Sequence, residues 1–143
     1  MTLYPVVLSL HVVTAVLGVG PIAALSIIAT STLAAARDEP APASAQASLN
    51  RLARWSQWSL VVMLLSGALI DYAVGGGLED TLWFRASFAL LLATGFVHSR
   101  IGRALRKARE SALPAEALRR IARHGWTMCG LIAVIVVLME VKP

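Results

Sequence analysis

Four long apolar segments, each with few charges, restrict what this sequence can fold into. A hydrocarbon core of roughly 30 Å takes about 20 helical residues to cross, and each segment is long enough to do so once. The sequence therefore predicts an all-α integral membrane four-helix bundle, a single transmembrane domain over residues 1–143. The predicted spans cover residues 3–36, 55–74, 82–100 and 124–142.

The overall composition supports lipid as the solvent and excludes several other classes. Hydrophobic residues make up 57% of the chain and charged residues only 15%, which is too apolar for an ordinary soluble domain. The net charge of +5 suggests nucleic acid, but the basic residues lie between apolar segments, so no nucleic-acid partner is expected. The single cysteine, Cys129, excludes an internal disulfide framework.

Basic residues predict the orientation. They gather in two connections, residues 37–54 and residues 101–123 with their borders. The basic residues concerned are Arg37, Arg51, Arg54, Arg100, Arg103, Arg106, Lys107, Arg109, Arg119, Arg120 and Arg123. Cytoplasmic loops carry such an excess, so both connections are expected inside and both termini outside, in a bacterial inner (plasma) membrane protein with several passes. The basic connections are also expected to contact anionic lipid headgroups.

Local signals refine the four spans. Pro21 lacks a backbone donor and predicts a kink in the first helix. The Pro/Ala/Ser/Gln-rich segment Asp38–Ser48 predicts a flexible linker. The segment 100–123 has helix-forming composition broken at Leu113-Pro114, so spans three and four are expected to extend as basic helical arms.

Ionisable side chains at membrane depth are costly and are the first candidates for function. His11 lies about 10 Å into the outer leaflet by helical rise. Gly18 shares its helix face and leaves a shelf for either a flat ligand or a neighbouring helix. Arg85, just inside the outer interface, either pairs with Asp71, Asp80 or Glu140 or binds an anionic group.

Two further histidines lie near the inner interface. Ser87, Leu91, Thr94 and His98 form a polar stripe on the third span that is expected to face the bundle interior. His124 opens the fourth span at a similar depth, so His98 and His124 are candidates for a bis-histidine haem, with Arg100 and Arg123 as propionate partners. The alternative is contact with headgroups or water. His11 and His98 differ in depth by about 12 Å and are not expected to share an iron.

The segment LHVVTAVLGVGP (Leu10 to Pro21) resembles the first helix of small four-helix membrane proteins that include HemJ-type protoporphyrinogen IX oxidases and the CopD copper-resistance membrane domain. The second-span SGAL, the third-span LWFRASFALLLATGFVHSRIGRALRK and the closing VKP extend the likeness. The resemblance implies b-type haem, a homo-oligomer, and haem or porphyrin handling by His11 and His98. The chain lacks the HemJ-type lysine early in helix three, offering Ser87 or Arg85, and has Arg123–Trp126 in place of Asn-Glu-x-Pro.

These observations lead to one hypothesis and two alternatives. The leading hypothesis is a haem b- or porphyrin-binding membrane protein, possessing membrane oxidoreductase activity if it is an enzyme. Its cofactor-binding candidates are His11, Gly18, Arg85, His98 and His124, with His11 and His98 as metal ligands. The first alternative is a scaffold or accessory subunit without a cofactor. The second is copper or small-solute transport, although Met63, Met128 and Met139 do not cluster with histidine along the sequence.

Overall fold

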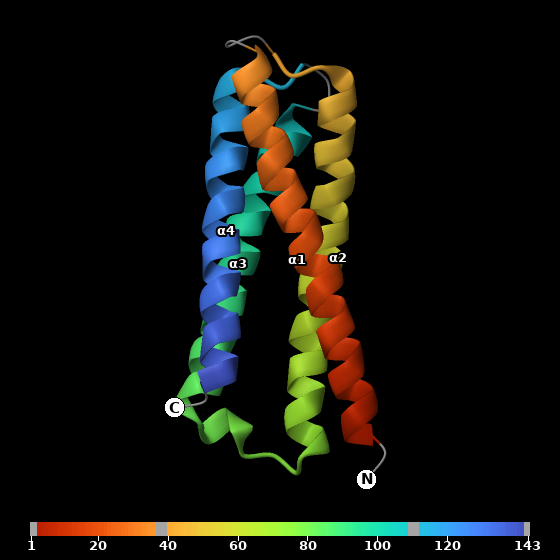
Figure 1. Ribbon diagram of the computed structural model, residues 1–143, viewed down its shortest axis with the longest axis vertical. Helices are drawn as coiled ribbons and strands as arrows, with labels where there is room; N and C mark the ends of the chain where they lie inside the picture. Colours follow the sequence, from red (N-terminus) through yellow and green to blue (C-terminus); the bar gives the residue numbers. More distant parts are fainter. Residues whose placement is uncertain (1–2, 37–39, 109–111, 142–143) are drawn as a thin grey trace.

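The computed structural model describes residues 3–36, 40–108 and 112–141, which form four long helices (Figure 1). The elements are α1 Leu3–Ala36, α2 Ala43–Ala73, the short 3-10 helix η1 Leu78–Asp80, α3 Leu82–Lys107 and α4 Ala115–Val141. The described residues contain no strand, so the predicted all-α four-helix bundle is confirmed. All four helices are long and apolar enough to cross a membrane, as a multi-pass membrane protein requires.

The helices run up, down, up and down, so neighbours around the bundle are antiparallel (Figure 1). We call the end with the chain termini and the α2–α3 connection the terminal end. The opposite end, where α1 joins α2 and α3 joins α4, is the basic end. α1 packs closely against α2 and α4, and α3 packs against α4, whereas α2 and α3 contact each other least of the four neighbouring pairs.

Large apolar side chains cover the outer surface of the bundle. On α1, Val16 and Leu17 are 67% and 57% exposed, and on α4 Val136 is 59% exposed. The interior instead contains small and polar residues beside aliphatic ones, including Ala29, Ser26 and Thr94, all at 0% exposure. Large apolar groups on the outside and small groups between helices are typical of a bundle whose solvent is lipid.

The basic end is packed, which corrects the prediction of a flexible linker for residues 40–48 of the segment Asp38–Ser48, whose first two residues lie outside the described part of the chain. α2 begins at Ala43, so the second half of that segment is helical. The amide of Ala41 donates to the carbonyl of Leu113 at 2.9 Å, and the Gln46 side chain donates to the carbonyl of Ala108 at 2.7 Å. These bonds join the two connections, and Leu113 at 0% exposure fills the space beneath them.

Three of the helices extend beyond the predicted membrane spans. The second helix begins twelve residues before the predicted span at 55, because Ala, Ser and Gln continue the helix from Ala43. The third extends from the predicted end at 100 to Lys107, and the fourth begins at Ala115 directly after Pro114, as expected for basic arms. Arg37, Arg109 and the closing Lys142-Pro143 lie outside the described residues.

Glycines bring the backbones of α1 and its neighbours together. A Cβ at Gly18 would lie 2.8 Å from the Cβ of Ser59 on α2. A Cβ at Gly125 on α4 would overlap the Ser26 hydroxyl and lie 3.2 Å from the Ser26 Cβ. α1 runs without interruption through Pro21, and the kink there stays a prediction. Close α1–α2 and α1–α4 approach therefore requires these two positions to lack a side chain.

Two glycines of α4 give a matched test of this packing. Gly125→Ala should lower the free energy of unfolding by about 1–3 kcal/mol, because the new methyl group overpacks against Ser26. Gly130→Ala should leave stability unchanged or slightly raised, since nothing lies within 4 Å of a Cβ there. Unfolding in mixed detergent micelles measures both, and equal losses would contradict the packing described.

Candidate functional site

Two histidines on different helices each bond to a serine of α2. His11 Nδ1 lies 2.7 Å from the Ser66 hydroxyl, and His98 Nε2 lies 2.8 Å from the Ser56 hydroxyl. Ten residues of α2 separate the two serines, which corresponds to roughly 15 Å along the helix. Each serine satisfies one ring nitrogen, so the cost of placing the imidazole at membrane depth falls.

The serines were missed in the sequence, although a signal was present. Ser56, Ser59 and Ser66 are 0%, 7% and 3% exposed and share the buried face of α2 with Met63. Their spacing follows helical periodicity inside an apolar segment. A polar face of this kind indicates which side of a transmembrane helix turns toward its neighbours.

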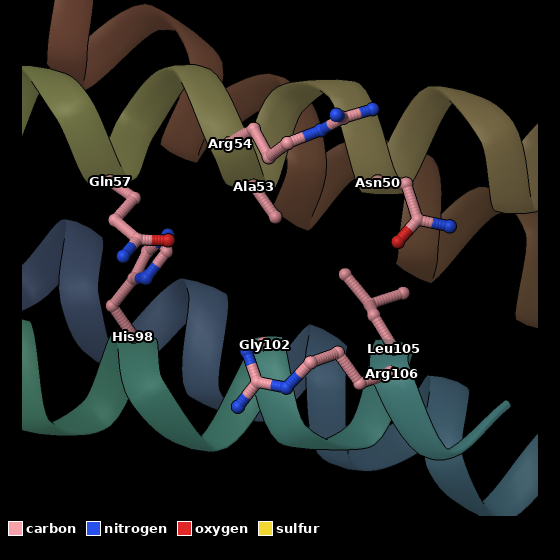
Figure 2. A pocket seen from close by; sticks show the side chains of 8 residues that line it. All are labelled: Asn50, Ala53, Arg54, Gln57, His98, Gly102, Leu105 and Arg106. Atoms are coloured by element: carbon pink, nitrogen blue, oxygen red, sulfur yellow. The ribbon is translucent and has the colours of Figure 1, made fainter. Parts of the chain in front are cut away.

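A groove runs between α2 and α3 toward the basic end, and we call it the α2–α3 groove. Its main hollow has a volume of about 420 Å³, lined by Asn50, Ala53, Arg54, Gln57, His98, Gly102, Leu105 and Arg106 (Figure 2). A second hollow of about 310 Å³ shares Gln57, His98, Gly102 and Arg106 with the first. In Figure 2, Gln57 from α2 and His98 from α3 point toward one another at one end of the groove.

Two glycines of α3 keep this groove open. A Cβ at Gly102 would meet only the far end of the Arg106 side chain, at 3.3 Å, and a Cβ at Gly95 would meet nothing within 4 Å. Gly102 lines both hollows and Gly95 lines the second. Without side chains at these positions, α3 presents bare backbone to the groove.

The groove is basic and holds a buried imidazole. Arg54 from α2 and Arg106 from α3 line it, and no carboxylate is among its lining residues. His98 is 5% exposed, and its Nε2 is occupied by Ser56. An anionic group entering from one side would meet two guanidinium groups, with the imidazole next to them. The arrangement suits a ligand that has both acidic groups and an apolar body.

A smaller cavity of about 40 Å³ lies among all four helices toward the terminal end, and we call it the terminal-end cavity. It is lined by His11, Met63, Leu64, Gly67, Phe84, Ser87, Phe88, Leu91, Ile135 and Met139. The buried Ser87 hydroxyl has no hydrogen-bond partner among the described residues. A Cβ at Gly67 would lie 3.6 Å from His11 Cε1, so this glycine lets the imidazole lie close to α2.

The third-span stripe faces inward as predicted: Ser87, Thr94 and His98 are 3%, 0% and 5% exposed. His98 and His124 do not line a common pocket. His98 lines the α2–α3 groove, whereas His124 lines a different groove between α3 and α4 with Arg100 and Arg123. The predicted pairing of these two histidines fails because α3 turns His98 toward Ser56 on α2.

Gly18 and Arg85 are occupied by structural contacts. Ser59 fills the space beside Gly18, so the helix-packing interpretation of this glycine holds and the shelf for a flat ligand does not form. The Arg85 guanidinium lies 3.1 Å from the Asp80 carboxylate, one of its three predicted partners, and both side chains are exposed.

Nearby, a hydrogen bond and charge repulsion from Asp71 raise the pKa of the Glu79 carboxyl.

The described side chains offer few ways to bind a metal ion. In the described part of the chain, no three His, Cys, Asp or Glu side chains group together. A metal site among these residues would therefore combine fewer than three such side chains with other ligands, such as a macrocycle or methionine thioethers. Compared with protein-family models, curated proteins and solved structures, the chain has no significant match.

The serine–histidine pairs predict a ranking of stability effects. Ser56→Ala leaves the buried His98 Nε2 without its partner and should cost about 1–3 kcal/mol of unfolding free energy. Ser66→Ala should cost less, because His11 is only half-buried. Ser99→Ala is the control, since that exposed hydroxyl bonds only a carbonyl of its own helix. Detergent unfolding that ranks Ser99→Ala equal to Ser56→Ala would contradict the role given to the Ser56–His98 bond.

Proposed function

We propose that this protein binds a carboxylate-bearing tetrapyrrole, haem b or a related porphyrin, in the α2–α3 groove. One observation carries the proposal: a buried histidine lies beside two arginines in a groove between two helices, and the described residues that line this groove include no carboxylate. The resemblance of the first and third spans to haem-handling membrane proteins points the same way.

Size supports the α2–α3 groove over the terminal-end cavity. Pockets for ligands of this kind measure roughly 300–1,000 Å³. The two hollows of the groove, of about 420 and 310 Å³, share four lining residues, and each falls in that range. The cavity beside His11, of about 40 Å³, has little more room than one water molecule takes up. A macrocycle on His11 would require α2 and α3 to separate, so we assign the tetrapyrrole to His98 instead.

Each residue of the groove then has a defined task. Ser56 holds His98 through Nε2, so Nδ1 would be the ring nitrogen that could hold the iron. Arg54 and Arg106 bind the carboxylates, and Asn50 and Gln57 supply amide hydrogen bonds at the groove wall. The glycines of α3 admit the flat face of the ligand. A bound haem would supply one-electron chemistry, which is the basis for an oxidoreductase role.

The orientation belongs to the same proposal. The basic end carries most of the arginines, so it is assigned to the cytoplasm, with both termini outside, in a bacterial inner membrane. The α2–α3 groove would then lie in the inner half of the bilayer. Its arginines would be near the headgroups, and the His98 imidazole would lie deeper.

A haem titration of the purified protein tests this proposal. The wild type should develop a Soret band that His98→Ala removes and that His124→Ala, on the other groove, leaves intact. Gly102→Leu should weaken haem binding at least tenfold by filling the groove, because a Cβ there meets only the end of Arg106. Gly130→Leu, matched in size on open surface, should bind as the wild type does.

Two results would count against the proposal. Absence of any Soret band in the wild type would reject haem binding and favour the scaffold alternative. Loss of the band in His11→Ala with retention in His98→Ala would move the cofactor to the terminal-end cavity.

A second candidate function, copper binding, has one observation in its favour. His11, Met63 and Met139 come from three different helices, yet all line the terminal-end cavity, although nothing in their sequence spacing groups them. Imidazole and thioether ligands suit Cu(I). Because Ser66 bonds His11 Nδ1, Nε2 is the nitrogen left for a ligand. The volume of about 40 Å³ suits a single ion.

Copper titration against a chromophoric Cu(I) chelator separates this candidate from the first. Met139→Leu should abolish binding of one Cu(I) per chain, and Met128→Leu, which conserves volume equally and does not line the cavity, should retain it. Equal retention by both variants would rule out a copper site at this cavity.

A further inference from the structure

A second basic groove lies between the basic ends of α3 and α4, and we call it the α3–α4 groove. It has a volume of about 480 Å³ and is lined by Arg100, Ile101, Arg103, Ala104, Lys107, Glu116, Arg120, Ile121, Arg123 and His124. A hollow of about 310 Å³, which shares Ala104, Lys107, Glu116 and Arg120, continues it toward the α3–α4 connection. Neither hollow is lined by His98 or by any residue of α2, so this groove is separate from the proposed tetrapyrrole site.

The charges in this groove are unbalanced. Among the described residues, four arginines and one lysine line it, with Glu116 as the one carboxylate. That carboxylate already pairs with Arg120 on the next turn of α4, at 3.0 Å. Arg100 and Arg103 from α3 and Arg123 from α4 thus face a common space from two helices. Convergent guanidinium groups of this kind bind phosphate oxygens.

The depth of the groove points to a lipid as the source of the phosphate. Trp126 lies two residues beyond His124, the last lining residue on α4, is 51% exposed, and donates from Nε1 to the Thr30 hydroxyl at 3.2 Å. Tryptophan concentrates at the level of lipid headgroups, so the cations at 123 and 120 lie at or just beyond that level. The groove therefore opens where phospholipid phosphates are found.

The surroundings of the groove suit a molecule with acyl chains. Ile101 and Ile121 give it an apolar floor. The Arg100 guanidinium packs 5.2 Å from the centroid of the Phe96 ring, and Phe96 is 60% exposed on the lipid-facing side of α3. A phosphate in the groove would place attached acyl chains along this exposed apolar surface. A soluble anion would contact only the charged side chains and would leave this apolar surface without a partner.

We infer that the α3–α4 groove is a binding site for the headgroup of an acidic phospholipid, such as phosphatidylglycerol, in the leaflet at the basic end. The site is defined by Arg100, Arg103 and Arg123, which act together on one phosphate-bearing headgroup. This site is more specific than the general attraction of a basic surface to anionic membranes. Binding depends on where these three cations lie, and the same number of charges elsewhere on that surface would not bind the headgroup in this way. The inference is independent of the tetrapyrrole proposal.

Native mass spectrometry of the full chain in detergent measures lipid binding directly. The wild type should bind phosphatidylglycerol in preference to phosphatidylcholine. Arg103→Gln with Arg123→Gln removes one cation from each side of the groove while keeping the Glu116–Arg120 pair. At about 1 kcal/mol per cation, this double variant should bind phosphatidylglycerol roughly 30-fold more weakly.

A charge-matched control separates a site from diffuse electrostatics. Arg51→Gln with Arg119→Gln removes two exposed cations of the basic end that do not line the groove, and should change binding less than threefold. Equal weakening in the two double variants would overturn the inference. So would displacement of the lipid by millimolar inorganic phosphate, which would indicate a soluble anion, or equal wild-type binding of both lipids, a comparison that needs no variant.

Discussion

The close approach of α1 to both α2 and α4 is the contact on which the rest of the bundle depends. Lipid solvates apolar side chains as well as a neighbouring helix does, so helices in a bilayer associate through tight packing of small groups. Gly18 against Ser59 and Gly125 against Ser26 provide that packing on two sides of α1. α3 is held mainly by α4 and by its hydrogen bond to α2. The α2–α3 contact is thus the loosest in the ring, and the largest hollows beside a buried histidine lie there.

The polar groups of the interior follow the same arrangement. A buried imidazole in lipid needs a partner, and α2 provides one hydroxyl for His11 and another for His98. Each serine hydroxyl satisfies one nitrogen of its imidazole and helps to fix the orientation of the ring. Both histidines therefore lie next to the α2–α3 contact, one near a cavity of atomic size and one in a groove of ligand size.

Much of the fold could be predicted, because hydrophobic length and helical periodicity are local properties of the sequence. The four apolar helices and the inward stripe from Ser87 to His98 both follow from them. The helical start at Ala43 was missed because proline and serine near residue 40 are typical of linkers, whereas the hydrogen bonds to Ala108 and Leu113 that order this segment come from residues more than 60 positions away. The separation of His98 from His124 depends on how α3 is rotated between α2 and α4. The equal depth of these two histidines on their helices does not show how α3 is rotated.

The central claim, that α2 and α3 enclose the ligand, can be tested by measuring where bound haem iron lies. A nitroxide attached at Val61, which lines the second hollow of the groove, should show strong relaxation enhancement from ferric haem in a Cys129→Ser background. The same label at Val136, exposed on the outer face of α4, should show little. Equal enhancement at both positions, or stronger enhancement at Val136, would contradict the account.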